Sequence, residues 1–208
     1  ISKIGRDGLI LVEENIVEKD ELELVQGIEI DKGYASSYFV NDLKSFEVIH
    51  NNPYVLIADQ PLESINQLRE IIDYIKQKNS PLVIIGEEID KDVISKLVLN
   101  NMQKKFKVVA IKFSSIKFLK NGVLEDLATL TFANYFTDNI QNTNKIFTVS
   151  DLGQAEKVIV RKEKSTFIIS KFSKLIAKRK INELNRELLN CESEYEKNIF
   201  KTRIARLS

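Results

Sequence analysis

Residues 54–113 read YVLIADQPLESINQLREIIDYIKQKNSPLVIIGEEIDKDVISKLVLNNMQKKFKVVAIKF, and this stretch decides the fold. Three short segments rich in apolar residues are typical of buried strands: Tyr54–Ala58, Leu82–Ile85 and Phe106–Phe113. Between them, apolar residues recur every three or four positions over 62–75 and 93–102, which predicts two helices, the second capped by Asp90. Strands that are apolar throughout and alternate with helices predict parallel pairing through right-handed crossovers.

The flanking sequence predicts further strands and a helical end. Alternating apolar residues predict half-buried strands at Leu9–Val12 and across 22–30, and Gly27 inside the second marks a bulge, a bend or a flexible joint. A shorter helix is expected at Val123–Thr131, followed by strands at Lys157–Val160 and Thr166–Ile169.

The C-terminal residues 171–207 have helical spacing, and Ser193 with Glu196 fits a capping box that begins a second helix after a turn near Asn190–Ser193. We therefore expect an α/β fold. Its parts are a core of parallel sheet and β-sandwich, flanking helices and a C-terminal antiparallel helix pair.

The composition excludes several classes of protein. The chain has 208 residues, 43% of them hydrophobic, which is enough for a packed core. The net charge of +1 gives no reason to expect nucleic acid or an acidic membrane as a partner. The longest apolar run is about five residues, against the roughly 20 needed to span a bilayer. No signal peptide is visible, and because residue 1 is Ile we interpret the chain as a fragment of a longer protein.

No pattern of catalytic or metal-binding residues is present. Cys191 and His50 are the only cysteine and the only histidine, which excludes an internal disulfide and metal sites with several His ligands, and favours a reducing compartment. The loops after the first two strands of the 54–113 stretch, Asp59-Gln-Pro61 and Gly86-Glu-Glu88, lack the glycines of a phosphate-binding loop. We expect no catalytic residue, no metal and no cofactor in this chain, and no enzyme activity of its own.

One feature is in surplus, namely apolar side chains. On the helix over 93–102, Val93, Ile94, Leu97 and Val98 cover an arc of about 140°, and Leu99 lies about 100° beyond it. Tyr34, Tyr38 and Phe39 form a second concentration next to turn residues. Core packing and an exposed binding patch both explain this surplus, and the residues alone favour the core.

Six stretches, in this order, resemble the apical domain of a group I (GroEL-like) chaperonin over nearly the whole chain. They are Asp31-Lys-Gly-Tyr-Ala-Ser-Ser-Tyr-Phe-Val-Asn41, Ile57-Ala-Asp59, Pro81-Leu-Val-Ile-Ile85, Leu97-Val-Leu-Asn-Asn-Met102, Leu124-Glu-Asp-Leu-Ala-Thr-Leu-Thr131 and Asp151-Leu-Gly-Gln-Ala155. The resemblance implies that residues 1–26 are the tail of an intermediate domain, that Gly27 lies in a hinge strand, and that 27–208 form the apical domain with 171–207 as a helical hairpin.

The resemblance also implies a function. The chain would belong to a 60-kDa-class subunit of a chaperonin ring whose ATP and Mg site lies outside it, so that the intact subunit would be an ATPase. The apical domain would bind non-native polypeptides and the mobile loop of a GroES-like co-chaperonin in a groove between two helices. The matching positions are Tyr34, Ser36, Tyr38 and Phe39, then Arg69 and Ile72, then Ile94, Val98, Leu99 and Asn100.

Three departures from the family pattern suggest a divergent subunit. Arg69 replaces a leucine of the groove, Ser114–Asn121 replaces a glycine-rich basic loop, and Phe132-Ala133 replaces a pair of glycines. We expect a location in an organellar stroma or matrix, plastid-type or mitochondrial, with the bacterial cytoplasm as the alternative. The alternative function is a mainly structural or co-chaperonin-selective role in a mixed ring.

Overall fold

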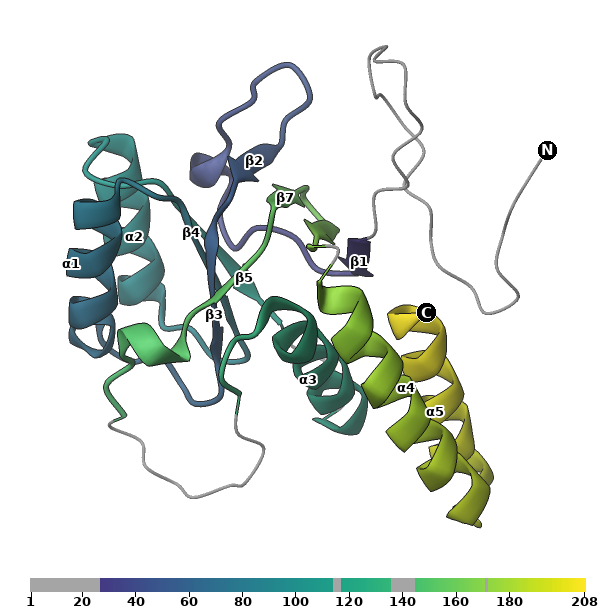
Figure 1. The fold of residues 1–208 in the computed structure, drawn as a ribbon. Coiled ribbons are helices and arrows are strands. Elements are labelled where there is room, and N and C mark those ends of the chain that lie inside the picture. The colour runs from purple at the N-terminus through teal and green to yellow at the C-terminus, as the bar shows by residue number, and fades with distance from the viewer. Residues whose placement is uncertain (1–26, 114–116, 136–144, 171) are drawn as a thin grey trace.

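A computed structural model describes residues 27–113, 117–135, 145–170 and 172–208 (Figure 1). The strands form two four-stranded sheets. The first is antiparallel throughout, in the order β1 (Gly27–Ile30), β8 (Ser165–Ile168), β7 (Lys157–Val160) and β2 (Val48–Asn51). The second pairs three parallel strands and one short antiparallel strand, in the order β5 (Val108–Lys112), β4 (Leu82–Gly86), β3 (Tyr54–Ala58) and β6 (Gly153–Gln154).

The helices cover both faces of the parallel sheet. A 3-10 turn, η2 (Ile65–Leu68), leads into α1 (Arg69–Lys78), and α1 lies beside α2 (Lys91–Met102) on one face, whereas α3 (Lys117–Thr131) lies on the other (Figure 1). The order β3–α1–β4–α2–β5, with β4 paired in parallel to both β3 and β5, confirms the predicted parallel pairing. Asp90 begins α2 as predicted, because its carboxylate accepts a hydrogen bond from the Asp92 N–H at 2.7 Å.

Coverage on both faces explains why these strands are apolar without alternation. Every residue of β4 is buried, as are four of the five residues in each of β3 and β5. From α1, Ile71, Ile72 and Ile75 join the same core. Each such side chain contributes about 1.5–3 kcal/mol when it leaves water, so this layer holds the fold together.

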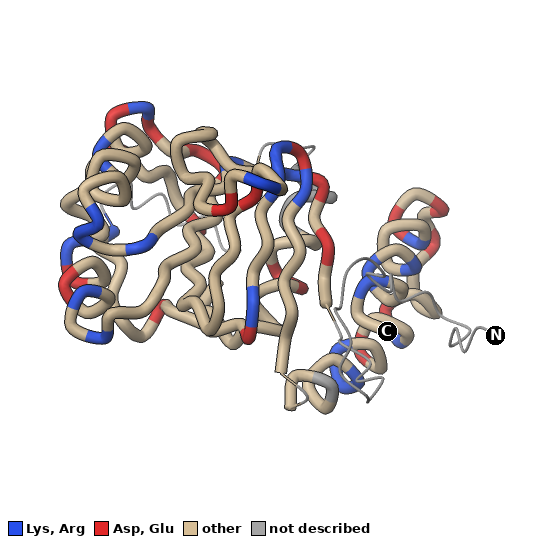
Figure 2. Tube along the Cα trace, turned by 90° about the horizontal axis from the view of Figure 1, so that it is seen from above, with Lys and Arg blue, Asp and Glu red and all other residues tan. Residues whose placement is uncertain are grey.

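The C-terminal residues form the predicted hairpin. Helices α4 (Ser173–Asn190) and α5 (Glu194–Leu207) pack side by side and run in opposite directions, and the Ser193 hydroxyl accepts a hydrogen bond from the Glu196 N–H at 3.4 Å (Figure 1). The hairpin carries charges of both signs (Figure 2). No helix among the described residues is both long enough and apolar enough to cross a bilayer.

A buried ion cluster joins the hairpin to α3. Asp126 is completely buried, and its Oδ1 accepts hydrogen bonds from Arg203 Nε at 3.0 Å and Nη2 at 2.8 Å. Arg206 Nη1 donates to Oδ2 of the same carboxylate at 2.6 Å. The Asp126 carboxylate on α3 thus accepts charge-assisted hydrogen bonds from two guanidinium groups of α5, and these bonds fix the position of α5 on α3.

Some expectations differ from the structure or fall outside it. The predicted strands at Leu9–Val12 and 22–26, the intermediate-domain tail 1–26 and part of Ser114–Asn121 lie outside the described residues. Gly27 begins β1, and its hinge role stays a prediction. Two strands, β2 and β6, were not predicted, because each is short and depends on partner strands far along the chain.

Candidate functional site

Helix α2 presents an apolar ridge to solvent. Ile94, Val98 and Met102 are spaced four residues apart and so lie along one side of the helix, with Leu99 next to them. Leu99 is 54% exposed and Met102 60% exposed, whereas Ile94 and Val98 are half-buried against the core. The apolar surplus in the sequence therefore has two parts, a buried side formed by Val93 and Leu97 and an exposed ridge.

A short 3-10 turn, η1 (Ser37–Phe39), packs against α2. The Ser36 hydroxyl accepts a hydrogen bond from the Tyr38 N–H at 3.3 Å and so caps the turn. The turn directs Tyr38 outward, where it is 67% exposed, and Phe39 into the core, where it is 1% exposed. Phe39 supports this surface from below, and the expectation that it contacts a ligand directly does not fit its burial.

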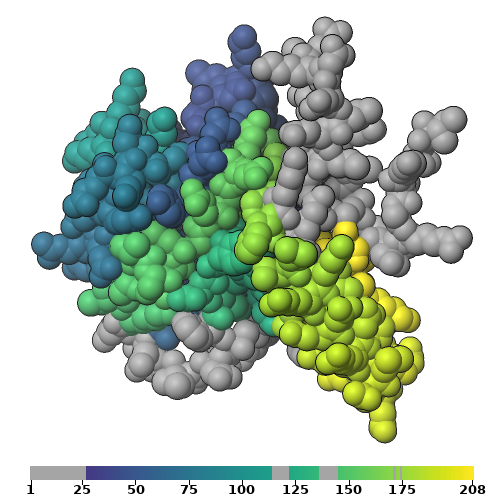
Figure 3. Space-filling model, viewed as in Figure 1, coloured from purple at the N-terminus to yellow at the C-terminus, as the bar shows by residue number. Residues whose placement is uncertain are grey.

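The loop after η1, residues 40–47, adds two exposed apolar side chains. The Asn41 side chain binds both the N–H and the carbonyl of Ile49, at 2.8 and 3.0 Å, and a bridge joins Asp42 to Glu47. Leu43 is 79% exposed and Phe46 58% exposed, and Phe46 adopts a left-handed backbone with φ 61°. Figure 3 shows this loop projecting at the top of the molecule, at the end where α2 finishes.

We call Tyr38, Val98, Leu99 and Met102 the α2–η1 surface. Sequence reasoning missed Met102 and the loop residues Leu43 and Phe46. Met102 could have been found, because it lies four residues after Val98 on the same side of the helix. The loop residues carry no periodic signal.

The α1 side of the expected groove is mostly charged. Arg69 is exposed, and Glu70 and Asp73 are exposed near it, whereas Ile72 belongs almost entirely to the core. The Asn100 side chain donates a hydrogen bond to the Lys96 carbonyl at 2.7 Å, so its amide is engaged on its own helix. Among the expected apolar contacts, those of α2 are therefore available and that of α1 is not.

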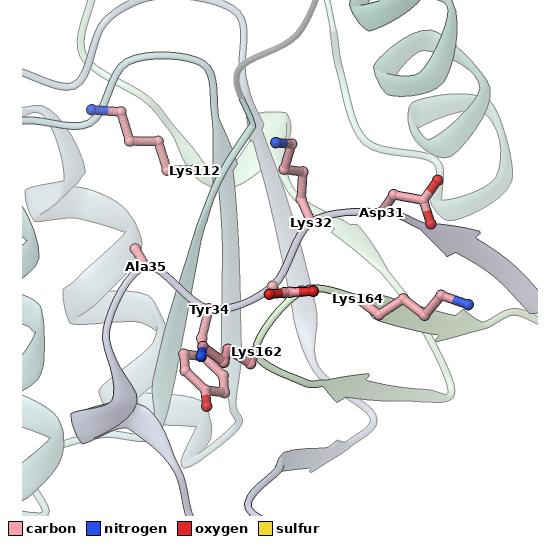
Figure 4. A pocket seen from close by; sticks show the side chains of 9 residues that line it. Asp31, Lys32, Tyr34, Ala35, Lys112, Lys162 and Lys164 are labelled. Atoms are coloured by element: carbon pink, nitrogen blue, oxygen red, sulfur yellow. The ribbon is translucent and has the colours of Figure 1, made fainter.

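Tyr34 lines a separate cavity of about 700 Å³ (Figure 4). Its N–H donates to the Arg161 carbonyl at 3.1 Å, and it forms a bridge with Ile111 of β5. Charged side chains dominate the wall, which comprises Asp31, Lys32, Gly33, Tyr34, Ala35, Lys112, Lys162, Glu163 and Lys164. The tyrosine is thus half-buried at the edge of the sheet instead of standing on the exposed surface with Tyr38.

The described residues bring together no group of three or more His, Cys, Asp or Glu side chains that could hold a metal ion. Parallel sheets commonly bind nucleotides at the carboxyl ends of their strands. At that end of β3 lies Asp59, whose carboxylate pairs with the Lys145 ammonium group at 3.1 Å. His50 is buried in β2, and desolvation lowers its pKa to about 4, so it is neutral at pH 7.

No protein family model matches the chain. Its fold is similar to the crystal structure of the chaperonin gp146 from the bacteriophage EL 2 (Pseudomonas aeruginosa) in the presence of ATP-BeFx, with a TM-score of 0.67. The sequences are 11% identical, and the match covers 87% of this chain and 36% of that one. The chain therefore has a chaperonin-like fold and spans about a third of the length of that chaperonin.

Proposed function

We propose that this chain is the polypeptide-binding apical domain of a ring-forming, ATP-dependent chaperonin subunit. The observation that carries the proposal is that Tyr38, Leu99 and Met102, on two elements packed together, are each more than half exposed within a chaperonin-like fold. A cluster of exposed apolar side chains, unlike a single one, is typical of an interaction surface.

The physics of the surface suits the capture of non-native chains. An unfolded chain differs from its folded form mainly in exposed apolar area, so an apolar surface recognises the unfolded state and not a particular sequence. Each anchor side chain contributes about 1.5–3 kcal/mol, and ordering the guest offsets part of that. A few anchors in one subunit therefore give weak, reversible binding.

Two further parts of the proposal follow from the resemblance. A co-chaperonin mobile loop that used the same surface would displace the guest by competition. ATP and Mg would bind in parts of the intact subunit outside this chain, and the compartment would be an organellar stroma or matrix, or else the bacterial cytoplasm.

The test compares one exposed leucine on the surface with one elsewhere. We expect Leu99→Ser to abolish the suppression of client aggregation by the 208-residue chain. The matched control is Leu189→Ser, since Leu189 lies on the hairpin and is 84% exposed, and we expect it to suppress aggregation as the parent does. Thermal unfolding of both variants checks that they are folded. Equal suppression by the two variants would contradict the proposed site.

The charged face of α1 favours a second candidate function. In it, the chain belongs to a divergent subunit of a mixed ring, where its role is mainly structural or is the selective binding of co-chaperonin. Arg69 stands exposed where the resemblance expects an apolar groove residue. If Arg69→Leu broadens the range of captured clients without changing the affinity for co-chaperonin, the second candidate is favoured. If the client range stays the same, the first is favoured.

A further inference from the structure

Exposed lysines lie within a few residues of the exposed apolar side chains of α2 and of the loop over 40–47. Lys44 lies in the loop between Leu43 and Phe46, Lys96 lies on α2, and Lys104 and Lys105 follow its last residue. All four are exposed, and none makes an ion pair with a described residue. Each apolar anchor on α2 or in the loop thus has a solvated ammonium group within a few residues.

The acidic groups of the same region are already engaged or are missing. The Asp42 carboxylate accepts the Lys44 N–H at 2.9 Å, and Glu47 pairs with Arg161. The sequence holds no Asp or Glu between Asp92 and Glu125. After Asp92, α2 and the residues that follow it therefore offer positive charge and no carboxylate, whereas in the loop the Asp42 carboxylate keeps its negative charge beside Lys44.

The backbone keeps these lysines close to the anchors. Lys96 precedes Leu99 by three residues, so the two side chains lie on neighbouring positions of one helix side. Lys104 takes a left-handed conformation, φ 55°, and the N–H groups of Lys104 and Lys105 donate to the carbonyls of Asn101 and Asn100 at 3.0 Å. The chain therefore turns directly after Met102, which holds both lysines at the end of the ridge.

We propose that this surface selects polypeptide segments in which Asp or Glu residues stand next to apolar ones, and that Leu43 and Phe46 serve as additional apolar anchors. The inference rests on the proposed function and names the class of segment that the site takes. An apolar segment flanked by carboxylates buries its apolar groups on the α2–η1 surface while its charges meet Lys44, Lys96, Lys104 and Lys105. A segment flanked by lysines meets like charges there.

The experiment uses three short fluorescent peptides with the same apolar residues, flanked by Glu, by Gln or by Lys. Anisotropy titration with the 208-residue chain measures the three dissociation constants at low salt. We expect the Glu peptide to bind about fivefold more tightly than the Gln peptide, because several exposed ion pairs each add a small contribution. The Lys peptide should bind most weakly. At about 1 M salt, where screening acts within about 3 Å, the three should converge.

Variants assign the preference to these side chains. In a triple variant with Lys44→Gln, Lys104→Gln and Lys105→Gln, the ratio of Gln-peptide to Glu-peptide dissociation constants should fall from about five to below about two, because only Lys96 remains. A control triple with Lys162→Gln, Lys178→Gln and Lys201→Gln removes the same charge from exposed positions elsewhere and should keep the ratio. Leu43→Ser combined with Phe46→Ser should weaken all three peptides.

The outcomes separate this inference from the proposed function. If the three peptides bind equally and Leu99→Ser abolishes all binding, the charge preference is wrong and the proposed function stands. If no peptide binds, both are wrong. If a single-stranded oligonucleotide binds more tightly than the Glu peptide and displaces it, the lysines serve nucleic acid and the inference is overturned.

Discussion

His50 links the fold to pH at the scale of one residue. It is 3% exposed in β2, and its Nε2 makes no hydrogen bond with any described residue. Desolvation, with a smaller contribution from the charge of Lys107, lowers its pKa to about 4 from an ordinary 6.5. The unfolded chain therefore takes up the proton more readily, and the folded state loses stability as the pH falls from about 6.5 toward 4.

We expect the free energy of unfolding to fall by up to about 3 kcal/mol across that interval, and His50→Leu to remove this part of the fall. Urea unfolding of the parent and the variant at several pH values between 7 and 4 measures both free energies of unfolding. Subtracting one from the other leaves the contribution of His50, because the carboxylates are the same in both proteins. The same pH dependence in both proteins would show that His50 is not responsible.

Single side chains also mark the limit of prediction from the sequence. Tyr38 and Phe39 are adjacent aromatic residues, and nothing in their spacing distinguishes them, yet one is exposed and the other buried. The hydrogen bond from the Tyr38 N–H to Ser36 and the packing of η1 on α2 decide which ring turns inward. That choice depends on contacts far along the chain, so the sequence could not reveal it.

At the scale of elements, the buried carboxylate of Asp126 decides how the hairpin docks. Asp126→Asn would remove the carboxylate that Arg203 and Arg206 share, and among the described residues only Arg203 would keep an acidic partner, Glu125 at 3.1 Å. We expect a loss of about 3 kcal/mol or more in the free energy of unfolding, together with faster hydrogen exchange in α4 and α5. Denaturant unfolding and hydrogen–deuterium exchange measure the two effects.

The matched control is Glu194→Gln, which removes one partner of an exposed pair with Lys197 at 2.9 Å. Exposed pairs of this kind contribute about 0.2–1 kcal/mol, so the control should change stability little. If Asp126→Asn were as mild as the control, the ion cluster would not hold the hairpin in place.

The elements that periodicity predicts are those whose burial is decided locally. The strands β3, β4 and β5 and the helices α1, α2 and α5 each carry enough apolar residues to indicate their type and their approximate bounds. The docking of α5 on α3 joins residues about 80 positions apart, and the loop over 40–47 depends on the Asn41 and Ile49 hydrogen bonds. Neither the docking of α5 nor the shape of this loop produces a periodic pattern in the sequence, so neither could be predicted from it.

At the scale of the whole molecule, we expect the number of linked chains to decide how tightly a client is retained. One chain offers a few anchors, so we expect weak binding, with a dissociation constant of about micromolar or weaker. Linking several chains on one scaffold should lower the apparent dissociation constant by about 10²–10⁴, provided that one client reaches two sites. Surface plasmon resonance with an unfolded client measures both forms.

The scaffold carrying Leu99→Ser chains is the control, and it should not retain the client, because linking chains amplifies only binding that each chain already has. A linked parent scaffold that binds no better than a single chain would argue against a role that depends on a ring.

Site-specific photo-crosslinking to an unfolded client tests the central claim most directly. A photoreactive residue at position 99, on the exposed ridge of α2, should crosslink to the client, and the same residue at position 189, on the hairpin, should not. A folded form of the client should give no crosslink at either position. Crosslinking at 189 alone, or equal crosslinking to the folded and unfolded client at 99, would contradict the account.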